Sequence, residues 1–188
     1  MKISGNAIRP GMVIEHKGRL WVAVKTQHTQ PGKGGAYLQV ELRDIRNGTK
    51  LNERFRSSEN VERARLDQRN HQYLYREDDN LTFMDNETFD QATLHQDLVG
   101  EAIDFLQDDM IVIIESYEGE PVGVKMPDST ICTVAETDAV VKGQTAAASF
   151  KPAFLDNGVR ISVPPHIEAG TRILVNIAER IYVERVKD

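Results

Sequence analysis

Glycines flank one lysine near the N-terminus: residues 30–36 read Gln-Pro-Gly-Lys-Gly-Gly-Ala, with the lysine at position 33. Glycine lacks a Cβ atom, so this backbone can turn through positive φ angles and nothing bulky shields the ammonium group of Lys33. An ammonium presented in this way can reach a phosphate, enter a crevice or accept a covalent modification. An ordinary solvated turn is the alternative for an arbitrary Gly-Lys-Gly sequence.

Two runs of strand-forming residues flank this lysine and must position it. Residues 20–24 (Leu-Trp-Val-Ala-Val) and 37–42 (Tyr-Leu-Gln-Val-Glu-Leu) are rich in apolar, β-branched and aromatic residues. Such runs on either side of a glycine-rich turn predict two paired strands. We therefore expect Lys33 at the tip of a hairpin, held away from the body of the protein.

Short strand-like runs with turn residues between them recur along the chain. Hairpin signals occur at Lys17-Gly18, Asn47-Gly48, residues 77–80 and residues 118–120, and further strands are predicted at 160–163, 172–177 and 181–186. Helical character is expected only at residues 86–91 and 99–106. Strands spaced this regularly indicate an all-β protein built from small barrels or sandwiches.

The positions of charged residues predict three modules, 1–64, 65–126 and 127–188. Basic residues end near Arg65 and acidic residues begin at Asp67, and Pro127 interrupts a strand-like run. Each third has the size of a five-stranded barrel of the SH3-like or OB type. Since no low-complexity linker separates the thirds, we expect the modules to abut in a fairly rigid rod.

The net charge of −6 conceals a strong asymmetry. Residues 1–64 contain 12 lysines and arginines against 6 acidic residues, residues 65–126 contain 4 against 15, and residues 127–188 contain 7 against 8. This distribution predicts a basic surface that faces a polyanion and an acidic surface that repels nucleic acid. It favours a protein that docks in one orientation over a general nucleic-acid coat.

Spacings typical of metal and nucleotide sites are missing from the sequence. The five histidines are scattered, and none lies at ligand spacing from Cys132 or a carboxylate. A phosphate-binding P-loop would need glycine at position 27 and serine or threonine at position 34, where the chain has Gln27 and Gly34. A dinucleotide fingerprint fails because Tyr37 stands at its last glycine. We expect neither a metal nor a cofactor.

Catalytic side chains are equally poorly placed. The adjacent carboxylates at 78–79 and 108–109 are predicted to lie in solvated turns, because neighbouring strand residues point to opposite faces. A Schiff-base lysine needs a desolvated pocket to lower its pKa, and a glycine-flanked tip provides the reverse for Lys33. The sequence therefore predicts no enzyme.

Sequence features that depend on the cellular compartment predict a cytoplasmic protein. The single Cys132 excludes a disulfide framework and fits a reducing cytosol. The N-terminal residues lack an apolar signal core, and residues 110–114, among the longest apolar runs, fall far short of membrane length.

The C-terminal third carries a second, more specific pattern. Lys151-Pro152-Ala153 is followed by Gly158, then by Val-Arg-Ile-Ser-Val-Pro at 159–164, and later by Gly170. This spacing closely resembles the signature of the bacterial elongation factor P family. Residues 8–11 (Ile-Arg-Pro-Gly), 31–34 and 48–50 (Gly-Thr-Lys) in the first third are similar to the same family.

The resemblance implies a fold and a function. Members have an SH3-like, KOW-type N-terminal domain and two OB-fold domains, in an elongated arrangement that mimics transfer RNA. They act as monomers, bind the ribosome between the peptidyl-tRNA and exit sites, and relieve stalling at consecutive prolines. The ribosomal RNA and proteins near the exit site, the P-site peptidyl-tRNA and the exit-site mRNA codon are the implied partners.

The resemblance also assigns site residues. Lys33 takes the position that an enzyme extends covalently, commonly with a β-lysyl group, so that the arm can hold the CCA end of the tRNA without doing chemistry itself. The loop residues implied to support it are Pro31, Gly32, Gly34 and Gly35. The implied RNA and ribosome contacts are Arg9, Lys25, Arg43, Arg54, Arg56, Gly143, Gln144, Thr145, Tyr182 and Arg185.

Some of these assignments have simpler alternatives or depart from the family. The five cations of the first module could equally form a solubilising surface, and Tyr182 an ordinary cross-strand aromatic. Where the family often has Gly-Asp-Thr, this chain has Gln144 in the middle position, which removes a negative charge. Residues 176–178 (Asn-Ile-Ala) replace a common Asp-Thr-Arg and remove an arginine expected to face RNA.

Other functions predict different sequences or behaviour. An OB-fold binder of single-stranded nucleic acid acting off the ribosome is disfavoured by the acidic middle third. A hydrolase or transferase lacks the required constellations. A paralogous branch of the resembled family usually has arginine at the tip, and Lys33 speaks against it.

Overall fold

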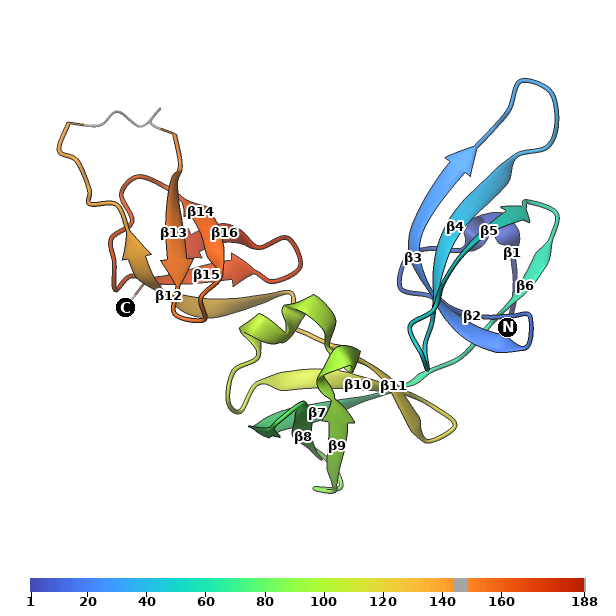
Figure 1. Cartoon of the computed structure of the whole chain (residues 1–188), viewed down its shortest axis with the longest axis horizontal. Coiled ribbons are helices and arrows are strands. Elements are labelled where there is room, and N and C mark those ends of the chain that lie inside the picture. Colours follow the sequence, from blue (N-terminus) through green and yellow to red (C-terminus); the bar gives the residue numbers. More distant parts are fainter. Residues whose placement is uncertain (144–148, 188) are drawn as a thin grey trace. The chain divides into compact units, whose positions relative to one another are not determined.

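The computed structural model describes residues 1–143 and 149–187, which form three curled antiparallel sheets (Figure 1). These residues divide into two compact units. The first contains Met1–Gln68 and Glu115–Gly123, and the second contains the other described residues. The prediction of an all-β fold made of small curled sheets is confirmed. The boundaries after residues 64 and 126 stay a prediction.

The N-terminal sheet has six strands in the order β1-β6-β2-β3-β4-β5. Alternating apolar residues turn one face of these strands inward, where Ile14, Trp21, Val40, Leu42 and Phe55 form a buried core. The elements are β1 (Lys2–Ser4), the 3₁₀ helix η1 (Gly5–Ala7), β2 (Val13–His16), β3 (Arg19–Thr29), β4 (Tyr37–Asp44), β5 (Lys50–Arg56) and β6 (Asn60–Arg63).

Two glycines in this unit are required by geometry. Gly5 lies so close to β5 that a Cβ atom there would be 2.4 Å from the backbone oxygen of Arg56. In the β2–β3 turn, Lys17 and Gly18 both have positive φ values, 51° and 72°. That pair of angles matches the twist of a two-residue hairpin, and the predicted hairpin is confirmed by the β2–β3 pairing.

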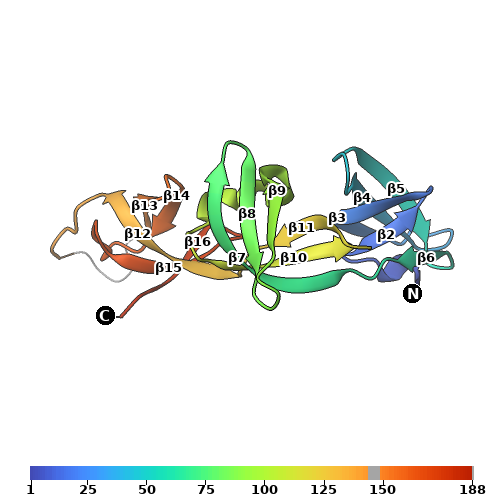
Figure 2. The ribbon, with the colours of Figure 1, turned by 90° about the horizontal axis from the view of Figure 1, so that it is seen from below.

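The middle sheet has five strands in the order β11-β10-β7-β8-β9. Figure 2 shows β7, β8 and β9 side by side. Its core contains Tyr73, Leu81, Phe83, Val112 and Ile114. The elements are β7 (Asp67–Glu77), β8 (Asn80–Asp85), β9 (Gln91–His95), the 3₁₀ helices η2 (Gln96–Leu98) and η3 (Gly100–Phe105), β10 (Ile111–Tyr117) and β11 (Glu120–Lys125).

The C-terminal sheet has the order β14-β13-β12-β15-β16. Its buried core residues come from β12 to β15 and their turns and include Val134, Leu155, Val163, Ile173 and Val175. The strands are β12 (Ser129–Thr137), β13 (Lys151–Leu155), β14 (Arg160–Val163), β15 (Arg172–Asn176) and β16 (Ile181–Arg185).

One residue of η3 belongs to the C-terminal core. Phe105 is fully buried among the apolar side chains of β12 to β15, although its helix lies in the sequence between β9 and β10 of the middle sheet. Arg180, in the turn before β16, covers it: the guanidinium carbon lies 5.6 Å from the centre of the Phe105 ring, and Nη2 donates a 2.9 Å hydrogen bond to the Glu101 carbonyl. Helix η3 is therefore packed against the C-terminal sheet within the second unit.

One kind of turn closes a hairpin in each sheet. After β4, the Asp44 carboxylate accepts the N–H of Arg46 at 2.8 Å, and the Asp44 carbonyl accepts the N–H of Gly48, whose φ is +73°. After β8, the Asp85 carboxylate accepts the N–H groups of residues 87 and 88, and its carbonyl accepts that of Phe89, whose φ is +62°. After β15, the Asn176 side chain accepts the N–H of residue 179, and the fifth residue of the turn, at position 180, has φ +54°.

Two local predictions need correction. Residues 86–91, expected to have helical character, form the Asp85-anchored turn and the first residue of β9. The Asp85 carboxylate accepts the N–H groups of residues 87 and 88 as it would at the start of a helix, but Phe89 has a φ of +62°, which ends the turn before a helix can continue. Residues 99–106 are helical as predicted, but as the short 3₁₀ helix η3. The adjacent carboxylates at 78–79 and 108–109 are exposed and lie in turns, which confirms that prediction.

Candidate nucleic-acid interface

Lys33 lies at the tip of the β3–β4 hairpin, which extends beyond the rest of its sheet (Figure 1). The last cross-strand pair is Thr29 with Tyr37, so residues 30–36 form the loop. Lys33 and its glycine neighbours are exposed. The structure confirms the predicted hairpin and the placement of the lysine at its tip.

The loop glycines serve different purposes. Gly34 has a φ of +118°, which side-chain-bearing residues rarely adopt, and so supplies the turn itself. At Gly32 and Gly35 an added Cβ would meet no atom within 4 Å, so these residues leave the lysine accessible. Pro31 lies beside the turn, with its Cγ 3.9 Å from the position of a Cβ at Gly34.

Four of the predicted basic residues share the outer face of β3, β4 and β5. On β4, Leu38, Val40 and Leu42 are buried, so Tyr37, Gln39, Glu41 and Arg43 face outward. Directly opposed residues lie on the same side of a sheet. The pairs Lys25–Glu41, Gln39–Arg54 and Tyr37–Arg56 therefore bring Lys25, Arg43, Arg54 and Arg56 together on that face.

Two residues of this face were missed by the sequence reasoning. Lys50 lies opposite Arg43 and adds a fifth cation. The guanidinium carbon of Arg54 lies 4.2 Å from the centre of the Tyr37 ring, a cation–π contact that orients the arginine. The alternation of residues along the two strands was the available signal, but it becomes informative only once the register between them is known.

Arg9 does not belong to the outer face. It lies in the loop between η1 and β2, and its Nη1 donates hydrogen bonds to the carbonyls of Asn6 and Ile8, at 2.9 and 3.0 Å. These bonds tie the side chain to its own loop, while the residue as a whole remains exposed.

The predicted contacts of the C-terminal sheet lie on separate elements. Gly143 is exposed in a turn with φ +88°, and Gln144 and Thr145 lie outside the described residues. Tyr182 is half-buried and packs against the C-terminal core, so it has a structural role whatever else it does. Arg185, at the end of β16, is exposed.

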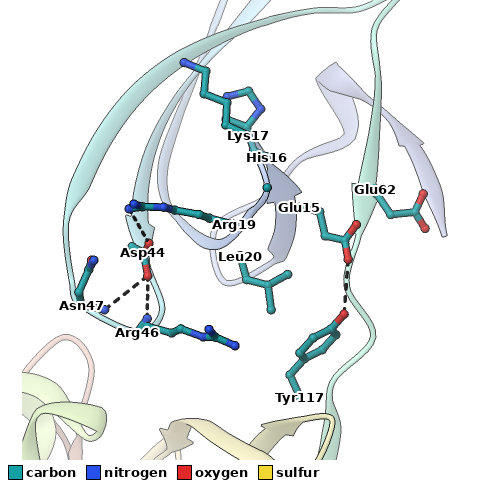
Figure 3. Close-up of a pocket in the computed structure, with 11 residues that line it drawn as sticks. Glu15, His16, Lys17, Arg19, Leu20, Asp44, Arg46, Asn47, Glu62 and Tyr117 are labelled. Atoms are coloured by element: carbon teal, nitrogen blue, oxygen red, sulfur yellow. Dashed lines mark hydrogen bonds and ion pairs between the residues drawn. The ribbon is translucent and has the colours of Figure 1, made fainter.

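A pocket of about 690 Å³ lies in the first unit, and none of the predicted site residues lines it (Figure 3). Its charges are largely paired: Arg19 lies 3.4 Å from the Asp44 carboxylate, and the Tyr117 hydroxyl donates a 3.4 Å hydrogen bond to Glu15. The adjacent Glu118 carboxylate raises the pKa of the Tyr117 phenol, with smaller contributions from burial and Glu15. This arrangement anchors the end of β10 to the N-terminal sheet.

Side chains with catalytic potential are held in structural roles. The Lys17 ammonium donates a 2.7 Å hydrogen bond to Glu53 and lowers the pKa of that carboxyl. Burial, with the nearby charge of Asp156, raises the pKa of the Cys132 thiol to about 11, which makes it a poor nucleophile.

Among the described residues, acidic, histidine and cysteine side chains nowhere form a group of three that could hold a metal ion. The helices of that same part of the chain are too short or too polar to cross a membrane.

Small curled sheets, a basic outer face and an exposed lysine hairpin define a class of modular β proteins, and comparison with known proteins narrows it. Residues 4–61 match the family model for the elongation factor P KOW-like domain, residues 66–124 the elongation factor P OB domain, and residues 131–185 the elongation factor P C-terminal region. The chain belongs to the elongation factor P family.

Individual relatives agree with this assignment. Elongation factor P of Rhizorhabdus wittichii is 58% identical over 98% of this chain and 99% of the relative, and that of Zymomonas mobilis is 57% identical over the same shares. Among solved structures, the protein titled eukaryotic translation initiation factor 5A from Methanococcus jannaschii has a TM-score of 0.50 and 25% identity, covering 68% of this chain and 92% of that one. The relatives support a role in translation elongation, and the family is not a known enzyme family.

Proposed function

We propose that this protein binds the ribosome between the peptidyl-tRNA and exit sites and promotes peptide-bond formation at consecutive prolines. Membership of the elongation factor P family supports the translational role. The basic outer face of β3–β5 supports an RNA partner, because clustered lysines and arginines bind phosphate backbones. We assign this face, together with Arg9, to the tRNA acceptor arm and the adjacent ribosomal RNA, and we assign residues 143–145, Tyr182 and Arg185 to the exit-site codon and the anticodon side.

The working end is the Lys33 hairpin. Lys33 is five residues from Leu38, the last buried residue of β4 before the tip. At about 3.3 Å per residue, it can lie up to ~17 Å beyond the core. An enzyme that transfers a β-lysyl group would lengthen this arm further, and an exposed lysine in an open glycine loop is accessible to such an enzyme.

The proposed contribution is positional. Proline is a poor nucleophile and restricts the nascent chain, so peptide bond formation waits on the alignment of the two tRNA ends. An extended cationic arm that contacts the CCA end would reduce the entropic part of this barrier. The ribosome remains the catalyst, and the protein needs no metal or cofactor for this role. We propose that the protein acts in the cytoplasm. It would act as a monomer of three modules, 1–64, 65–126 and 127–188.

The exposed lysine at the hairpin tip is the observation that carries the proposal, and it sets the test. Synthesis of a reporter with three consecutive prolines should be accelerated by the natively produced protein and not by Lys33→Ala. The matched control is Lys187→Ala, another exposed lysine, which should behave as wild type. Intact mass of the native protein should exceed the sequence mass, and the excess should disappear in Lys33→Ala. Equal reporter synthesis with Lys33→Ala and wild type would refute the mechanism.

Binding in the absence of ribosomes separates this proposal from the alternative of a general single-stranded nucleic-acid binder. Tight binding of free oligonucleotides with a steep salt dependence would favour the alternative. We expect weak binding of free oligonucleotides, because residues 65–126 carry 15 acidic residues against 4 basic ones.

A further inference from the structure

A second groove lies on the C-terminal sheet, and none of its lining residues belongs to the lysine hairpin. It has a volume of about 550 Å³. Among the described residues, its wall contains two arginines, a phenylalanine ring, a tyrosine ring, a serine hydroxyl group and two isoleucines, and no carboxylate. The lining residues are Phe150, Arg160, Ile161, Ser162, Arg180, Ile181 and Tyr182.

Phe150 is unusually exposed for an aromatic residue that is also held in place. Its relative exposure is 59%, although large apolar side chains are normally buried. The edge-to-face contact with Tyr182, with ring centres 6.5 Å apart and planes at 88°, orients the ring. Tyr182 is itself packed on the C-terminal core. Phe150 therefore presents an oriented aromatic surface to the groove.

The two arginines differ in how far they are already used. Arg180 donates a hydrogen bond to the Glu101 carbonyl and lies 3.5 Å from the Asp104 carboxylate, so its charge serves the packing of η3. Arg160 is exposed on β14, and its cross-strand neighbour on β13 is Phe154, which carries no charge. Arg160 is therefore the cation of the groove that a ligand can use.

An oriented aromatic surface and an available guanidinium in the wall of one groove fit a nucleotide in single-stranded RNA. Bases stack on exposed aromatic rings, and arginine binds the neighbouring phosphate. We propose that this groove binds one unpaired RNA nucleotide, with the base stacked on Phe150 and its phosphate on Arg160. The inference rests on the proposed function, since the ribosome or its tRNA supplies the RNA.

The test uses the full-length protein and ribosomes that carry peptidyl-tRNA and have a vacant exit site. Phe150→Ala should raise the Kd about 5- to 150-fold, the range that corresponds to losing one base–aromatic stack. Phe150→Tyr should restore the affinity. Phe89→Ala is the matched control, because Phe89 is also highly exposed (69%) but lies in the β8–β9 turn of the middle sheet, and its Kd should equal that of wild type.

Salt dependence tests Arg160 separately. Arg160→Ala should reduce the slope of log K against log salt concentration by about 0.7 to 0.9, the contribution of one phosphate contact, whereas Phe150→Ala should leave the slope unchanged. Arg172→Ala, which removes an exposed arginine from β15, is the control for a general charge effect and should not change the slope.

Each alternative outcome has a distinct meaning. Wild-type affinity of Phe150→Ala, or full rescue by Phe150→Leu, would overturn the stacking proposal, and the second result would identify an apolar protein contact instead. Equal slopes for Arg160→Ala and wild type would overturn the phosphate contact. If the wild-type protein fails to bind ribosomes, both the proposed function and the RNA ligand of the groove are refuted. If the wild-type protein binds ribosomes and accelerates the proline reporter, an unchanged Kd for Phe150→Ala refutes only the proposed nucleotide site in the groove.

Discussion

Phe105 should couple the stability of the middle and C-terminal sheets, because this residue of η3 is fully buried in the C-terminal core. The informative perturbation is Phe105→Ala, which removes the whole ring. Arg180 lies over the same ring, so the substitution also removes a cation–π contact and loosens the turn before β16.

The size of the effect follows from this burial. Truncating a buried phenylalanine to alanine costs about 3–5 kcal/mol in unfolding free energy, because burial is lost and a cavity remains. A small domain has only about 5–15 kcal/mol in total. We therefore expect the melting temperature of the second unit to fall by more than about 10 °C.

The chain provides its own internal control for this measurement. Trp21 is the single tryptophan, and it is buried in the N-terminal core. Tryptophan fluorescence should therefore report the first unit and show an unchanged transition in Phe105→Ala. Calorimetry of the whole chain should show the destabilised transition of the second unit.

Two results would refute the reasoning. A calorimetric loss below about 1 kcal/mol would mean that Phe105 contributes little to the C-terminal core, against the expected cost of a buried ring. An equal shift of the Trp21 transition would mean that the effect is not confined to the second unit. Phe89→Ala, a substitution at a highly exposed phenylalanine, should change stability by less than about 0.5 kcal/mol.

Three further predictions concern single residues. Gly34→Ala forces a side chain into a φ near +118°, at a local cost of about 1–3 kcal/mol. In a reporter titration, this variant should need a higher protein concentration to relieve proline stalling, whereas Gly35→Ala should not. Identical titrations for the two variants would contradict this prediction. The Cys132 thiol, buried and with a pKa of about 11, should react with iodoacetamide at pH 8 only as fast as the protein unfolds, which denaturant-dependent labelling rates would show. The N–H groups of residues 88 and 87 lower the pKa of Asp85 in the folded state. Asp85 therefore contributes its full share to the free energy of unfolding above the pKa of the unfolded carboxyl, about 4, and loses it as the pH falls through the pKa of the folded carboxyl. In Asp85→Asn, the free energy of unfolding should decrease less steeply as the pH is lowered.

The sequence was most informative where local chemistry determines structure. The hairpins at Lys17-Gly18 and Asn47-Gly48, and the tip that carries Lys33, were predictable because glycine and asparagine permit turn conformations that other residues resist. The family signature in the C-terminal third was also recognisable from a short stretch of sequence, residues 151–170. These features placed the candidate working residue before any contact was known.

Features that depend on pairing between distant segments were harder to predict. Strand β6 has one buried residue, Val61, and is a strand because β1 and β2 pair with it. Lys50 and Tyr37 joined the basic face only through the register of β5 on β4. Phe150 and Arg160 gave no signal in the sequence, since they line one groove only through the pairing of β13, which Phe150 precedes, with β14, which Arg160 begins.

The turns anchored by Asp44, Asp85 and Asn176 have a consequence for the order of folding. Each closes a hairpin between strands adjacent in the sequence, so its contacts span few residues and cost little loop entropy. Hairpins of this kind form in about 1–10 μs, much faster than long-range pairings such as β1 with β6. Each sheet thus contains a fast local nucleus. During synthesis, the β4–β5 hairpin can form before β8 and β9 exist, so the sheets can begin to fold in sequence order.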